Sequence, residues 1–224
     1  MPSVPLLTEV DALLRSDHFH LTDTDECYSI GEYTPRAGFS FSETNSLISN
    51  LKKTPDKRGM PEWRYKERAI LQAGKDLREA TNLDWLKGGV VVVPIPPSKA
   101  KDDPMYDDRI LQVANVFCQG TGAHVRELLY QTTSTEACHR SDSRRDVSLL
   151  KSILKVDEAL AKPTPKEILL LDDMLTTGAH FVAAKHVLGA RFPSAEICGF
   201  FVARRVIVND DYDDSNDYDI FHDR

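Results

Sequence analysis

Short runs of mainly apolar residues divide the second half of the chain into regular units. Val90–Val93, Ile168–Leu171 and Ile197–Val202 are such runs, and Val125–Tyr130 is a more mixed one. Runs of this length, bounded by turn residues, are typical of strands that are buried on both faces of a parallel sheet. The pattern therefore predicts four core strands, with Val206–Val208 as an extension of the last.

Apolar residues at three- and four-residue spacing lie before and between these strands. The spacing predicts helices that begin at Ser42, at Pro61 and near Asp107, and others over residues 149–160 and 177–191. Strands that alternate with helices predict an α/β fold with a largely parallel sheet flanked by helices.

The N-terminal part follows a different pattern. Residues 1–16 suggest a short amphipathic helix, Cys27–Tyr33 a strand, and Phe39–Phe41 a second strand that pairs with the first. We therefore expect a small N-terminal α+β region over residues 1–87, a core over 88–208 and an acidic tail over 209–224.

Charge is unevenly spread along the 224 residues, which carry a formal net charge of −7. The tail holds seven Asp and one Arg, or −6, so the remaining chain is close to −1. This balance gives no global attraction to nucleic acid. The tail is interpreted either as a solvated end or, because Tyr212, Tyr218, Ile220 and Phe221 interrupt the charge, as a docking or self-masking segment.

Several classes of protein are disfavoured by what the sequence lacks. No apolar stretch approaches the roughly 18 residues needed to cross a bilayer, and no positive charge precedes an apolar core at the N-terminus. The four cysteines are far apart and form no Cys-x-x-Cys pair, which argues against a zinc site made of cysteine alone and against a disulfide framework. We expect a cytoplasmic protein with no membrane partner.

The run Glu167–His180 carries the strongest chemical signal. A buried strand ends in Asp172 and Asp173, and a polar turn, Thr176-Thr177-Gly178, leads into a helix. Ligands in open α/β sheets bind beyond the carboxyl ends of strands, and such a turn offers N–H groups, hydroxyls and a favourable dipole to a phosphate. Because two carboxylates would repel phosphate, they are better suited to accept hydrogen bonds from sugar hydroxyls. The run predicts a site for a phosphorylated sugar.

Three other interpretations of this run compete with a sugar-phosphate site. A buried strand followed by a solvated Asp turn would explain the pattern without function. A P-loop would require a Gly-Lys-Ser/Thr ending, which is missing. A phosphoacceptor aspartate of a receiver domain would leave the Thr-Thr-Gly turn unexplained.

The same run resembles the phosphoribosyl pyrophosphate (PRPP) loop of type I phosphoribosyltransferases. It matches the family pattern from Asp172 to Gly178 and departs from it at His180, where the family has Thr or Ser. Together with residues 45–53 and the Pro94–Pro97 loop, it is most similar to the ComF-like branch. The four-cysteine zinc module usual in that branch is missing, and the resemblance covers residues 42–208, which would leave a nucleobase-selecting hood in the N-terminal region.

The resemblance implies a role for each part of the site. Asp172 and Asp173 would grip the ribose hydroxyls as the catalytic pair. The 5′-phosphate would be held by Thr176, Thr177, Gly178, Ala179 and His180. The leaving pyrophosphate would be held by Ser98, Lys99, Lys101, Arg140, Arg144 and Arg145, although the basic residues of both segments could equally be solvated surface. Mg²⁺ would be bound through ligand oxygens and water, with Asp172 as the one side chain expected to reach it.

The implied activity is transfer of phosphoribose to a base, amine or nucleotide-like acceptor, with release of pyrophosphate. Two alternatives remain open at this point. One is a non-catalytic sensor of PRPP or a nucleotide, and the other is an effector subunit of a nucleic-acid-associated assembly such as a defence complex, with protein or nucleic acid as its partner. A homodimer is a further expectation, because related folds often dimerise.

Overall fold

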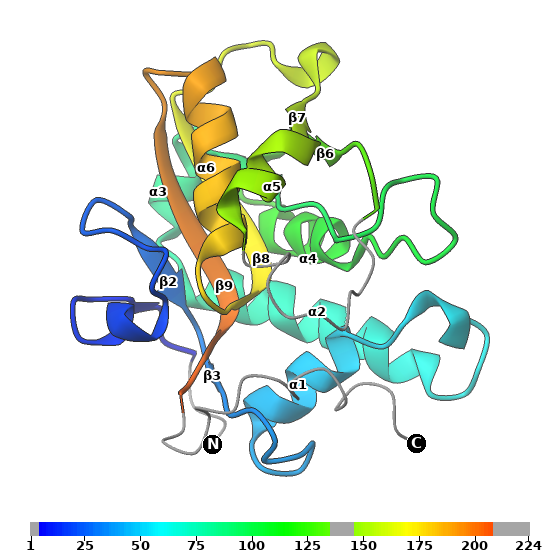
Figure 1. Ribbon diagram of the computed structural model, residues 1–224. Coiled ribbons are helices and arrows are strands. Elements are labelled where there is room, and N and C mark those ends of the chain that lie inside the picture. The colour runs from blue at the N-terminus through cyan, green and yellow to red at the C-terminus, as the bar shows by residue number, and fades with distance from the viewer. Residues whose placement is uncertain (1–4, 135–145, 208–224) are drawn as a thin grey trace.

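The computed structural model describes residues 5–134 and 146–207 of the chain (Figure 1). One large sheet has the strand order β1-β2-β9-β8-β4-β5, and β3 also pairs with β9. Within the described residues, every pair in this sheet is parallel except β1–β2. The strands are β1 (Thr8–Glu9), β2 (Cys27–Ser29), β3 (Glu32–Tyr33), β4 (Val91–Pro94), β5 (His124–Val125), β8 (Glu167–Leu175) and β9 (Glu196–Arg205). A second, antiparallel pair joins β6 (Leu129–Gln131) to β7 (Leu154–Val156).

Helices cover both faces of the large sheet. They are α1 (Glu43–Leu51), α2 (Trp63–Ala80), α3 (Leu83–Lys87), α4 (Arg109–Cys118), α5 (Val147–Ile153) and α6 (Ala179–Arg191), with 3₁₀ turns at Leu14–Asp17, Pro55–Lys57 and Glu158–Leu160. In β8, Ile168 and Leu170 pack with Phe181 of α6, while Leu169 and Leu171 pack with residues of α1, α2 and α4 on the other face. The predicted α/β architecture with a mostly parallel, helix-flanked sheet is confirmed.

The strands β4, β8 and β9 and the start of α1 lie where the sequence predicts them. Ser42 caps α1, because its hydroxyl accepts the N–H of Asn45 at 3.0 Å. The N-terminal strands join the same sheet: β2 and β3 both pair with β9. The N-terminal region therefore shares a sheet with the core.

Two predicted N-terminal elements are wrong. The chain forms β1 and a 3₁₀ turn where a helix over residues 1–16 was predicted, and residues 1–4 lie outside the described part. Phe39–Phe41 forms a turn, and the rings of Phe39 and Phe41 are 56% and 60% exposed. The buried amide of Asn45 bonds the backbone of Thr34 and of Gly38, so this loop is held without a strand ladder.

Two core predictions also need correction. The helix predicted over residues 149–160 ends at Ile153, and the chain then turns into β7, which pairs with β6. The single strand predicted over residues 125–130 is divided between β5 and β6, because the chain turns between them, with the N–H of Leu128 bonded to the carbonyl of Arg126. None of the helices in the described residues combines the length and apolar content needed to span a bilayer.

Candidate functional site

The carboxyl ends of β4 and β8 form one edge of the sheet, and a pocket opens there. Pro94 of β4 pairs with Leu171 of β8, which brings the proline loop beside Asp172. The pocket is lined by Pro94–Pro97, by Asp172, by residues 106–111 at the start of α4, and by Glu127 and Leu129. This is the crevice where ligands of open α/β sheets bind. The Thr176–Gly178 bend lies outside the lining of this pocket.

The two predicted carboxylates point to different surroundings. Side chains alternate along a strand, so Asp172 and Asp173 project to opposite faces of β8. Asp172 lines the pocket, and one of its carboxylate oxygens accepts the N–H of Asp173 at 2.7 Å. Asp173 is 4% exposed and lies on the face covered by α1, α2 and α4. The two carboxylates therefore have different surroundings: Asp172 faces the pocket, and Asp173 faces the helices α1, α2 and α4.

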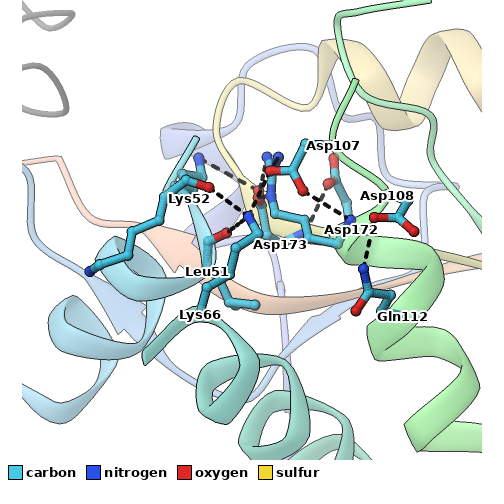
Figure 2. Close-up of polar contacts among 10 residues, drawn as sticks. Leu51, Lys52, Lys66, Asp107, Asp108, Gln112, Asp172 and Asp173 are labelled. Atoms are coloured by element: carbon cyan, nitrogen blue, oxygen red, sulfur yellow. Dashed lines mark hydrogen bonds and ion pairs between the residues drawn. The ribbon is translucent and has the colours of Figure 1, made fainter. Parts of the chain in front are cut away.

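Asp173 belongs to a buried network of ion pairs (Figure 2). Nε and Nη2 of Arg109 both lie 2.7 Å from one oxygen of Asp173, and Nζ of Lys52 lies 3.5 Å from the other. Arg109 also contacts Asp107 at 2.9 Å, and Asp107 accepts a hydrogen bond from Lys66 at 2.7 Å. The network connects α1, α2, the start of α4 and β8, and it fixes Asp173 in place.

The surroundings move the pKa values of the two acids in opposite directions. Burial, together with the neighbouring charge of Asp173, raises the pKa of Asp172 to about 7. Burial alone would also raise the pKa of Asp173, but the positive charges of Arg109 and Lys52 outweigh it and hold that pKa well below its ordinary value. Near neutral pH, Asp173 is ionised, and Asp172 is close to its midpoint.

The raised pKa of Asp172 predicts a pH-dependent cost to stability. Between the ordinary carboxyl range and about pH 7, folded Asp172 holds a proton that the unfolded chain releases, so its contribution to stability falls as pH rises. Asp172→Asn keeps an oxygen for the N–H of Asp173 but cannot ionise. We expect it to raise the free energy of unfolding by about 1–3 kcal/mol at pH 8 and to have little effect at pH 4.5. Urea denaturation at both pH values measures this.

A control for this prediction is Asp23→Asn, at an exposed position, which is expected to change stability little at either pH. Destabilisation by Asp172→Asn at pH 8 would contradict the assignment of the raised pKa to this residue.

The bend after β8 has the features of an anion site. Gly178 has φ of +87°, which favours glycine, and α6 begins at the next residue. Among the described residues, no acceptor bonds the N–H groups of Thr176, Thr177 and Gly178. Ala179 N–H is only weakly engaged, at 3.4 Å from the Thr177 hydroxyl. His180 lies half-buried in the first turn of α6.

Both lysines of the predicted pyrophosphate-binding segment form ion pairs. Nζ of Lys99 lies 3.7 Å from Asp103, and Nζ of Lys101 lies 2.9 Å from Glu127. The carbonyl of Ser98 accepts a hydrogen bond from the side chain of Gln131 at 2.8 Å. The other predicted pyrophosphate residues, Arg140, Arg144 and Arg145, lie outside the described residues.

Two groups of residues near the site were not predicted. The first is the pair of cations beside Asp173, Arg109 and Lys52. The second is the segment around His18, which contacts the bend: His20 N–H donates to the carbonyl of Thr177 at 3.0 Å. An isolated histidine carries no sequence signal for such a contact. The basic pair Lys52-Lys53 follows an amphipathic helix, which is only a weak sequence signal for a cation in the site.

Comparison with known proteins gives no family for this arrangement. No family model matches the chain, and a search of curated proteins finds no significant match. Within residues 5–134 and 146–207, no three His, Cys, Asp or Glu side chains are grouped so as to hold a metal ion. The residues of the site must therefore carry the functional argument.

Proposed function

We propose that this protein has a type I phosphoribosyltransferase-like fold, binds PRPP at the carboxyl ends of β8 and β4, and transfers its phosphoribosyl group to a nitrogen acceptor. The observation that carries the proposal is the Thr176–Gly178 bend, whose three successive N–H groups have no acceptor among the described residues and stand at the start of α6. N–H groups at a helix N-terminus favour a phosphate electrostatically and by hydrogen bonding.

Asp172 is placed to act on the sugar. It follows the buried part of β8 and is four residues before Thr176, and one of its oxygens remains after the other accepts the Asp173 N–H. A carboxylate accepts strong hydrogen bonds from hydroxyls, so Asp172 would hold a ribose hydroxyl while the bend holds the 5′-phosphate. We propose that Asp173 acts from the opposite face of β8, through the negative charge that the ion-pair network holds there.

The reaction would break the bond between the anomeric carbon and pyrophosphate and form a bond from that carbon to the acceptor nitrogen. Such substitutions pass through a transition state with oxocarbenium character. The carboxylates of Asp172 and Asp173 would stabilise the positive charge on the sugar ring, because their positions at the end of β8 are set before the reaction begins. Positioning of the two reactants would supply the rest.

The residues present are compatible with a Mg²⁺ ion that is held mainly by oxygens of the bound PRPP. Mg²⁺ commonly keeps several waters and uses one or two carboxylates together with substrate phosphates. Asp172 is the carboxylate suited to this role, because among the described residues it has no cation paired with it, whereas Asp173 and Asp107 are paired with Arg109. When bound, the ion would neutralise charge on the leaving pyrophosphate.

Calorimetric titration of PRPP in the presence of Mg²⁺ tests the proposal. We expect the wild-type protein to bind PRPP and Asp172→Asn to bind it about 10–100-fold more weakly, in line with about 1–3 kcal/mol for a lost hydrogen bond to a charged group. Because Asp172→Asn is also expected to stabilise the fold, weaker binding cannot be attributed to unfolding. Asp84→Asn, in α3 with a side chain that is 88% exposed, serves as the control, and release of pyrophosphate with bases and amines reports turnover. Wild-type protein that does not bind PRPP would refute the proposal.

A second candidate function is PRPP binding without catalysis. It is favoured by the ion pairs of Lys99 with Asp103 and of Lys101 with Glu127, which reduce the positive charge that the segment offers to pyrophosphate. Binding of PRPP with no pyrophosphate release over a panel of acceptors would favour this candidate.

A further inference from the structure

Residues 17–25, here called the strap, pack directly on the Thr176–Gly178 bend. We propose that His18 in this strap is a positioning residue that directs the N–H groups of the bend toward a bound phosphate. The inference rests on the proposed phosphate site for its functional meaning. The contacts that carry it connect parts of the chain that are about 158 residues apart in sequence.

Three successive contacts join the strap to the bend. Nδ1 of His18 forms a short hydrogen bond with the carbonyl of Thr176. The N–H of His20 donates to the carbonyl of Thr177 at 3.0 Å. A Cβ added to Gly178 would lie 2.8 Å from the side chain of Leu21, so the strap also lies close against the glycine.

The geometry of the peptide bond turns these contacts into an orientation of the bend. A trans peptide is planar, so the N–H of one residue points away from the carbonyl of the residue before it. With the carbonyl of Thr176 bound to His18, the N–H of Thr177 points away from the strap. The same holds for the N–H of Gly178, because the carbonyl of Thr177 is bound to His20. The strap thus directs two donors to the side opposite itself.

The strap is itself fixed at both ends. Nζ of Lys185 in α6 lies 2.6 Å from Asp25 and donates to the carbonyl of Thr24 at 3.0 Å. At the other end, Asp17 lies 3.4 Å from Arg204 of β9. The strap is therefore tied to the helix that follows the bend and to the strand beside β8, which makes it a rigid support for the bend.

The chemistry of His18 makes the contact specific. A carbonyl can only accept, so Nδ1 must carry the proton. His18 is fully buried, and its Nε2 has no hydrogen-bond partner among the described residues. The ring therefore contributes a single donor at Nδ1. Asparagine can place an N–H donor at a similar distance from the backbone, whereas glutamine places its donor one methylene further out.

The test compares His18→Asn with His18→Gln, using ribose 5-phosphate as the probe in calorimetry and NMR hydrogen exchange of the His20 amide without ligand. We expect His18→Asn to bind within about threefold of wild type and to keep the His20 amide protected. His18→Gln is expected to bind about tenfold more weakly and to lose that protection. Equal behaviour of the two variants in both measurements would overturn the positioning role.

The two measurements separate the two ideas. Wild-type protein that does not bind ribose 5-phosphate would remove the proposed function, while the exchange of the His20 amide would still show whether His18 holds the strap on the bend. If His18→Gln does not fold, Leu21→Ala loosens the contact with Gly178 without changing the imidazole. It is expected to weaken binding about threefold, and unchanged binding would overturn the inference.

Discussion

Replacing Lys66 by methionine is expected to lower the free energy of unfolding by about 3–5 kcal/mol, because it removes one partner of a buried ion pair. Lys66 is 1% exposed, and its ammonium donates to Asp107 and to the carbonyls of Leu51 and Lys53. Methionine fills much of the same volume but supplies no donor, so two carbonyls lose this donor and Asp107 keeps only its contact with Arg109 among the described residues. Urea denaturation at pH 7.5 measures the loss.

The matched control for Lys66→Met is Lys87→Met. Lys87 pairs with Asp84 at 2.9 Å on the surface, where both side chains are mostly exposed. Such pairs contribute about 0–1 kcal/mol, so a small change is expected. A loss below about 1 kcal/mol for Lys66→Met would show that the buried pair is not essential to the fold.

The expected cost of losing Lys66 matters for the site because the same network fixes Asp173. Lys66 holds Asp107, and Asp107 accepts from Arg109, which in turn holds Asp173. The two helices α1 and α2 thus support the site through charge as well as through apolar packing. A substitution in this network is therefore expected to shift the pKa of Asp172 without any direct contact with that residue.

Local sequence patterns were sufficient for most of the core. The continuous apolar run of β8 identified a strand buried on both faces, and the run from Val90 did the same for β4. Ser42 identified the start of α1 through its capping hydroxyl. In each case the signal and the structure depend on the same few neighbouring residues, so no distant contact was needed.

Elements whose conformation depends on distant contacts were not predictable in this way. β1 and β2 are two and three residues long, and β2 is held by pairing with β9, about 170 residues further along the chain. The turn at Phe39–Phe41 is a local exception, because it depends on the side chain of the nearby Asn45. The helical pattern after Leu149 ends early because β7 pairs with β6.

The same distinction applies to the candidate site. The order of acids, bend and helix could be inferred from residues 167–180, because they are consecutive. The lowered pKa of Asp173, by contrast, is set by Arg109 and Lys52, which come from other parts of the chain. The contact of His18 with the bend likewise has no local signature. Sequence therefore indicated where the site lies, and packing decides how each carboxylate is used.

Replacing Arg109 by methionine is expected to destabilise the protein by about 3–5 kcal/mol at pH 8 and by clearly less at pH 5. Arg109 is the main positive charge beside Asp173, and its removal leaves two adjacent carboxylates, with Lys52 as the remaining ion-pair partner of Asp173 among the described residues. The pKa of Asp173 should then rise above its value in the unfolded chain. As pH falls, a carboxyl with a raised pKa takes up its proton in the folded protein before it does so in the unfolded chain. Between these two pKa values, the free energy of unfolding therefore falls as pH rises. Denaturation at the two pH values measures both quantities.

Arg191→Met provides the matched control for this variant. Arg191 pairs with Glu158 at 2.8 Å, with both side chains exposed, so a change below about 1 kcal/mol is expected at either pH. In the wild type, the lowered pKa of Asp173 supports the fold above the ordinary carboxyl range and this support is lost only in strong acid. Arg109→Met should therefore reverse the sign of the pH dependence that Asp173 contributes. An equal loss at pH 5 and pH 8 would mean that Arg109 acts through packing, and that Asp173 does not depend on it for its charge.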